Sequence, residues 1–158
     1  MYPPQHMGFA TLSLKGRALR LLAQREHSRA ELTTKLARHV QDGDDLAALL
    51  DELQAKDFIN ETRVVASVVH RRASRLGAAR IRQELQAKGL SADAVQEAVA
   101  NLQGSERDRA QDVWQRKFGE PAADLAARAR QMRFLLARGF AGDTVRRVVP
   151  GVERPPPA

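Results

Sequence analysis

The sequence contains no cysteine, which excludes disulfides, zinc–thiolate sites and cysteine nucleophiles together. Such a chain is typical of a reducing compartment, and we expect a cytoplasmic protein. Aromatic residues make up only 4%, which argues against a β-sandwich or barrel packed on rings. No apolar run approaches the roughly 18 to 20 residues of a membrane span, and the N-terminal residues show no leader pattern. We therefore expect no membrane partner.

The sequence also lacks the patterns on which catalysis or cofactor binding would rest. It has no phosphate-binding Gly-rich loop, no HExxH pair and no strand–turn–helix setting for a serine nucleophile. The four histidines are scattered, and none lies at metal-ligand spacing from a second histidine or a carboxylate pair. These absences predict a protein that is not an enzyme, with no catalytic residue, no cofactor and no metal.

The charge of the chain is strongly and unevenly positive. Its 158 residues, 43% hydrophobic, suffice for one or two globular domains, and the net charge is +7. Residues 1–61 carry eight basic against nine acidic side chains, residues 62–105 seven against three, and residues 106–158 eleven against seven. This balance favours polyanions or acidic protein surfaces as partners, contacted through the last two thirds of the chain.

Apolar residues recur at spacings of three and four with no sustained alternation, which predicts an all-α fold. Ser28 and Glu31 have the spacing of a capping box, and Gly77 is a natural helix stop. The expected apolar stripes are Leu32, Leu36 and Val40; Leu46, Leu49, Leu50 and Leu53; Val64, Val65, Val68, Val69 and Leu76; Ile81 and Leu85; Val95, Val99 and Leu102; Ala110, Val113, Trp114 and Phe118; Leu125, Ala129, Met132 and Leu136; Val145, Val148 and Val149.

The sequence repeats itself at a nearly fixed offset. Residues 85–95 (LQAKGLSADAV) match residues 135–145 (LLARGFAGDTV) at an offset of 50, and a weaker copy lies 49 residues earlier. We therefore predict three tandem three-helix repeats in an elongated, curved helical array, with one compact helical domain as the alternative. The predicted boundaries are an N-terminal extension at 1–13, repeats at 14–60, 61–105 and 106–151, and a disordered tail at 152–158.

Six arginines and no carboxylate lie between residues 62 and 83. On a helical wheel Arg72 falls on the apolar face, so it must reach solvent or find a carboxylate or carbonyl partner. We expect an exposed patch made of Arg71, Arg75, Arg80 and Arg82, for which a merely solvated face is the alternative. A second cluster of basic residues follows later in the chain. The first third instead has an acidic edge, which we expect to pair with a basic surface on a neighbour. The second cluster comprises Arg116, Lys117, Arg128, Arg130, Arg133 and Arg138; the acidic edge comprises Asp42, Asp44, Asp45, Asp51 and Glu52.

Several motifs resemble a known family. Residues 58–63 (FINETR), 68–72 (VVHRR) and 77–90 (GAARIRQELQAKGL) are similar to the central repeat of the RecX family of recombination regulators. Residues 114–119 (WQRKFG) and 131–140 (QMRFLLARGF) look like its third repeat. Valines stand at positions 64 and 68 where the family usually has aromatics, and Ala78 replaces its proline.

The resemblance implies a monomeric, non-enzymatic protein of three tandem three-helix repeats that binds along the RecA recombinase filament. RecX proteins inhibit the ATPase, strand-exchange and coprotease activities of RecA, so this one would restrain recombination and the SOS response. Non-specific binding to single-stranded or double-stranded DNA is also implied. The residues expected to bind filament or DNA are Arg71, Arg75, Arg80, Arg82, Lys88, Arg116, Lys117, Arg130, Arg133 and Arg138; those expected to be structural are Arg72, Gly77, Gly89, Trp114 and Gly139.

Two other functions stay open at this point. Residues 28–58 resemble the helix-turn-helix part of a winged-helix domain, which would make the protein a stand-alone DNA-binding module. The helix at 44–56 is acidic, however, where a recognition helix needs base-reaching side chains. The third possibility is an adaptor in transcription or translation that docks on another protein.

Overall fold

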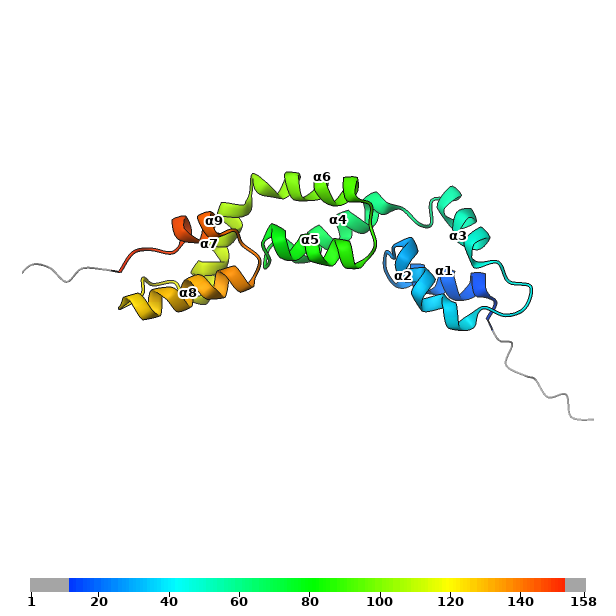
Figure 1. Cartoon of the computed structure of the whole chain (residues 1–158), viewed down its shortest axis with the longest axis horizontal. Helices are drawn as coiled ribbons and strands as arrows, with labels where there is room; N and C mark the ends of the chain where they lie inside the picture. Colours follow the sequence, from blue (N-terminus) through cyan, green and yellow to red (C-terminus); the bar gives the residue numbers. More distant parts are fainter. Residues whose placement is uncertain (1–11, 153–158) are drawn as a thin grey trace, which may run out of the picture. The chain divides into compact units, whose positions relative to one another are not determined.

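The computed structural model describes residues 12–152, and within them the fold is entirely helical, as predicted. The expected N-terminal extension and tail therefore fall almost wholly outside the described residues. The chain divides into two compact units, residues 1–60 and 61–158. Each unit is built from α-helices (Figure 1), which bury apolar residues on one face.

The described part of the first unit, residues 12–60, contains three α-helices and one short 3₁₀ helix. The helices are α1 (Leu14–Gln24), α2 (Arg29–Leu36), η1 (Ala37–His39) and α3 (Leu46–Ala55). The Ser28 hydroxyl accepts from the Glu31 N–H while the Glu31 carboxylate accepts from the Ser28 N–H, so the predicted capping box is confirmed. The apolar pattern of the sequence did not predict helix α1. The core of the unit comprises Leu14, Ala18, Leu32, Leu36, Leu50, Leu53 and Ile59.

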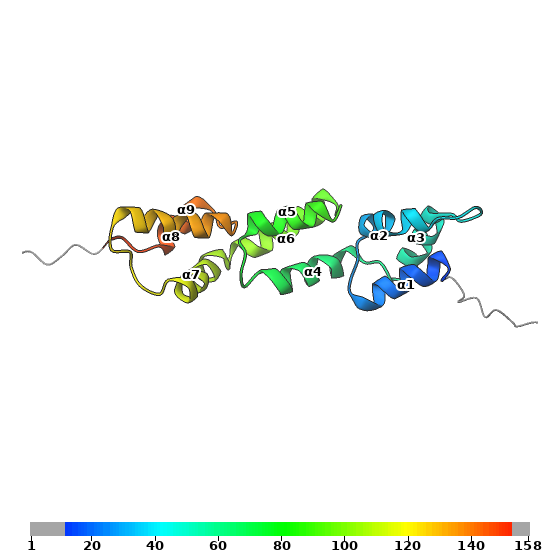
Figure 2. The same ribbon diagram turned by 90° about the horizontal axis from the view of Figure 1, so that it is seen from below.

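In the second unit, residues 61–152 form two further three-helix bundles. The first bundle has α4 (Glu61–Arg72), α5 (Ala78–Ala87) and α6 (Ala92–Gln103); the second has α7 (Glu106–Lys117), α8 (Leu125–Ala137) and α9 (Gly142–Val148). Helix α5 packs on α6 with α4 against both, and α7 and α8 pack on α9 (Figure 2). Each bundle has its own apolar core. The sharp turns after α5 and α8 place Gly89 and Gly139 at positive φ, +71° and +90°, where a side chain would be strained.

Two predictions about these helices are wrong. Helix α4 ends at Arg72, and Gly77 is instead the N-cap residue that precedes α5. On α8 the buried residues are Gln131 and Leu135, while Leu125 and Leu136 of the predicted core stripe are 77% and 45% exposed. The apolar spacing correctly predicted a helix here, but α8 packs its neighbours against a different face from the predicted one.

A candidate polyanion-binding site

The two bundles of the second unit are joined through backbone atoms. The Gly77 N–H donates to the Arg138 carbonyl (2.8 Å), and the Ala79 N–H donates to the Gly139 carbonyl (3.2 Å). A Cβ on Gly77 would lie 2.3 Å from the carbonyl carbon and oxygen of Gly139, closer than atoms can approach. Position 77 therefore requires glycine because the backbones of the two bundles approach each other closely there. A sequence pattern within one helix does not reveal this contact.

Two charged side chains of α7 complete this junction. The Arg109 guanidinium donates to the carbonyls of Ala73 (2.9 Å), Leu76 (2.7 Å) and Leu102 (3.2 Å). Its burial lowers the pKa of this guanidinium, although the Glu106 charge opposes the shift. The buried Glu106 carboxylate accepts from the Ala78 N–H (3.2 Å) at the start of α5.

Sequence reasoning missed both of these residues. For Glu106 the sequence did contain a signal, namely its position on the apolar face of α7. It lies one turn before Ala110 and two turns before Val113 and Trp114. A charged residue on such a face has to find a buried partner. Arg72 carried the same signal, and its Nε lies 3.1 Å from a Glu84 carboxylate oxygen.

A shallow pocket of about 270 Å³ opens beside this junction. Val113 and Phe134 contribute its apolar lining, and four cationic side chains surround them. Phe134 packs edge-on against Phe118, with ring centroids 5.5 Å apart. We call the site the junction pocket. Its cations are Arg75 from the α4–α5 connection, Arg116 and Lys117 from α7, and Arg138 from the end of α8.

The phenyl ring of Phe134 holds two of these cations in place. The Lys117 Nζ lies 5.3 Å from the ring centroid, and the Arg138 Cζ lies 4.7 Å from it. Arg116 is positioned differently, by donating to the Ser74 carbonyl across the bundle junction. Cation–π contacts and a carbonyl fix each cation without neutralising its charge.

No carboxylate pairs with the four cations of the junction pocket among residues 12–152. Some cations elsewhere in the described chain do have such partners: Arg29 pairs with Asp51, and Lys15 and Lys56 share Glu52. Several positive charges that converge without a counter-ion favour an anionic ligand. The pocket can therefore accept carboxylates or phosphates from a partner.

The remaining residues expected to bind a partner are spread over other surfaces. Arg80 donates to the Ala137 carbonyl (2.9 Å), and Arg71 donates to Ser67 on its own helix. Arg82 lies on the opposite side of α5 from Arg80, in a separate depression between α5 and the start of α6. Lys88 is half-buried at the end of α5. Exposed positions on the outer face of α8 are occupied by Arg130 and Arg133.

Other predicted features have local roles. Trp114 is 4% exposed, and its indole N–H donates to the Gln131 side-chain oxygen (3.0 Å). In the acidic edge, Asp45 caps α3, while Asp51 and Glu52 pair with cations of their own unit. The part of the chain that the structure describes contains no group of three potential metal ligands. No helix in residues 12–152 is both long and apolar enough to span a bilayer.

Comparison with known proteins decides the family. Three family descriptions match in chain order: the first three-helix domain of RecX over residues 15–53, the second over 60–99 and the third over 105–149. Regulatory protein RecX of Leptothrix cholodnii is 57% identical over 138 residues, covering 87% of this chain and 88% of that protein. The chain belongs to the RecX family. This confirms the resemblance and the three-repeat, all-α fold.

Further RecX proteins agree with this assignment. Regulatory protein RecX of Ralstonia nicotianae is 53% identical over 142 residues, which are 90% of this chain and 89% of that one. The crystal structure of RecX from Lactobacillus salivarius superposes with a TM-score of 0.70 at 19% identity, covering 85% of this chain and 91% of that chain. The protein is thus a regulatory protein of the RecX type.

Proposed function

We propose that this protein binds the RecA recombinase filament and inhibits its ATPase, strand-exchange and coprotease activities. It would thereby restrain recombination and the SOS response without chemistry of its own. The observation that supports this proposal is the junction pocket, in which Arg75, Arg116, Lys117 and Arg138 converge without a carboxylate partner. A filament of protein and DNA offers acidic side chains and phosphates in a regular array, which suits such a site.

The backbone junction supports the same function. Because Gly77 and Gly139 join the two bundles, cations from α7 and from both sides of the junction are held in one arrangement before a partner arrives. A preorganised site loses less conformational entropy on binding than separate flexible side chains would.

The test is inhibition of RecA ATP hydrolysis on single-stranded DNA. The double variant Arg75→Ala/Lys117→Ala removes two pocket charges, and neither side chain bridges the two bundles through a hydrogen bond. If each contact contributes about 1 kcal/mol, the half-inhibitory concentration rises about thirtyfold. The matched control is Arg20→Ala/Arg107→Ala, which removes two exposed charges outside the pocket and should inhibit like the unchanged protein.

Two results would contradict the proposal in different ways. Unchanged RecA hydrolysis with the unaltered protein would refute filament inhibition itself. Equal potency of the pocket variant and its control would refute the junction pocket as the binding site.

Direct binding to DNA is the second candidate function, since the unpaired pocket cations also suit phosphates. Phosphate binding loses about 0.9 log units of affinity per neutralised phosphate for each tenfold rise in salt on double-stranded DNA. A fluorescence titration of labelled DNA at several salt concentrations measures this slope. A slope that falls by one to two phosphates in Arg75→Ala/Lys117→Ala would assign the pocket to DNA.

A further inference from the structure

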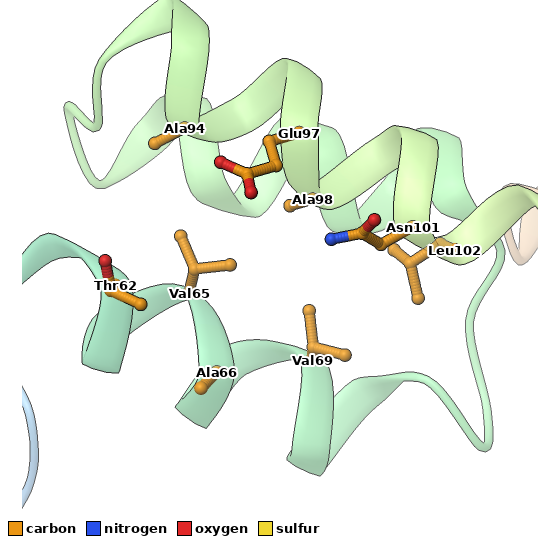
Figure 3. Close-up of a pocket in the computed structure, with 9 residues that line it drawn as sticks. All are labelled: Thr62, Val65, Ala66, Val69, Ala94, Glu97, Ala98, Asn101 and Leu102. Atoms are coloured by element: carbon orange, nitrogen blue, oxygen red, sulfur yellow. The ribbon is translucent and has the colours of Figure 1, made fainter.

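An apolar groove of about 360 Å³ runs between α4 and α6, on a part of the second unit separate from the junction pocket. Val65 and Val69 of α4 face Ala98 and Leu102 of α6 across it (Figure 3). Valine and alanine are small, so the two helices leave room for side chains from a third element. We call this the α4–α6 groove.

The rim of the groove is polar and acidic. The carboxylate of Glu97 and the carboxamide of Asn101 extend from α6 over the apolar floor, opposite Thr62 of α4 (Figure 3). None of these three side chains has a hydrogen-bond or ion-pair partner within residues 12–152. Glu97 would repel phosphate, so the groove suits a protein element that pairs apolar side chains with a cation.

The same chain carries a partly exposed element of that kind on α8, in which Ala129 and Met132 are half-buried and Met132 also packs on the core of its own bundle. Leu125, Ala129, Met132 and Leu136 follow one another at spacings of four, three and four, so they form one stripe along the helix. Leu125 is 77% exposed and Leu136 is 45% exposed. We call this the α8 stripe. It spans about 16 Å along the helix, slightly longer than the lined part of the groove.

One edge of the α8 stripe carries unpaired positive charge. Arg133 lies about 80° around the helix from Leu125, and Arg130 lies farther in the same direction. Both are exposed, and neither has a carboxylate partner among the described residues. The stripe thus offers aliphatic side chains next to a guanidinium, which complements an apolar groove with Glu97 on its rim.

From this complementarity we infer that the α8 stripe of one copy docks in the α4–α6 groove of a second copy. The geometry is that of an amphipathic helix laid in a groove between two helices. Groove and stripe are different surfaces, so the contact is heterologous and adds copies in a row rather than closing a symmetric dimer. The expected monomer is then the state at low concentration, and copies brought together along a polymeric target would associate.

The interface is small, so we expect weak association with a dissociation constant of about 100 µM. Sedimentation velocity of the full chain alone, from about 10 to about 500 µM, tests this. The weight-average sedimentation coefficient should rise through the dimer value without a plateau. A protein that stays monomeric throughout, or that stops at a dimer, overturns the inference. RecA is absent from this experiment, so its outcome is independent of the proposed function.

Charge exchange identifies the contact. Glu97→Arg and Arg133→Glu should each weaken self-association at least tenfold, since each places like charges opposite one another. The double variant Glu97→Arg/Arg133→Glu should restore it. Asp112→Arg, at an exposed position on α7, is the matched control and should associate like the unchanged chain. Undiminished association of either single variant, or failure of the double variant to recover, overturns the pairing of groove and stripe.

Discussion

Replacing Gly77 by alanine tests whether the two bundles of the second unit depend on backbone contact. The φ angle at Gly77 is −78°, which alanine adopts readily, so the substitution causes no strain within the backbone. The new Cβ, however, would lie 2.3 Å from Gly139 backbone atoms and 2.4 Å from the Phe140 nitrogen. Because these neighbours are backbone, the bundles have to separate.

The expected cost follows from what this separation disrupts. Two backbone hydrogen bonds across the junction, from Gly77 to Arg138 and from Ala79 to Gly139, contribute about 1 kcal/mol each. Overpacking of a close contact costs about 1 to 3 kcal/mol. We therefore expect the free energy of unfolding to fall by about 2 to 4 kcal/mol, which lowers the midpoint of thermal unfolding by about 10 °C or more.

The fluorescence of Trp114 is the appropriate assay. It is the single tryptophan of the chain and is buried in the second unit, so it reports the unfolding of that unit alone. Gly104→Ala is the matched control: Gly104 has a helical φ of −64°, and nothing lies within 4 Å of its added Cβ. The control should unfold at the original temperature or slightly above it. Equal midpoints for Gly77→Ala and Gly104→Ala would refute the account of the junction.

Two further predictions concern buried polar groups. Arg109→Met removes the guanidinium that donates to the Ala73 and Leu76 carbonyls, whereas the Leu102 carbonyl still accepts from Ser105. The Trp114 transition should therefore lose about 2 to 4 kcal/mol, with Arg109→Lys recovering only part. Equal stability of Arg109→Met and the unchanged chain would exclude this role. Burial lowers the pKa of His27 below 6.5, with Arg25 and Lys35 beside it. As the pH falls, His27 is protonated in the unfolded chain at a higher pH than in the folded chain. The first unit should therefore lose stability as the pH falls below 6.5 and be unaffected above it. Amide exchange in α1 and α2 measures this effect, which should be absent in His27→Gln.

Local patterns determined the helices after α1 and their order. The capping box of Ser28 and Glu31 rests on interactions within a few residues, so the sequence alone sufficed to predict it. The internal offset of about 50 residues determined the three repeats in the same way, because each repeat carries its own apolar pattern.

Only the tertiary structure decided which faces are covered and which charges meet. Periodicity shows that Leu125 and Leu136 share a face of α8, but not that α7 and α9 pack on another face. Arg75 and Lys117 are 42 positions apart in the sequence, and they converge because the chain returns across the bundle junction. Contacts of this kind depend on how completed helices pack together, which no window of neighbouring residues encodes.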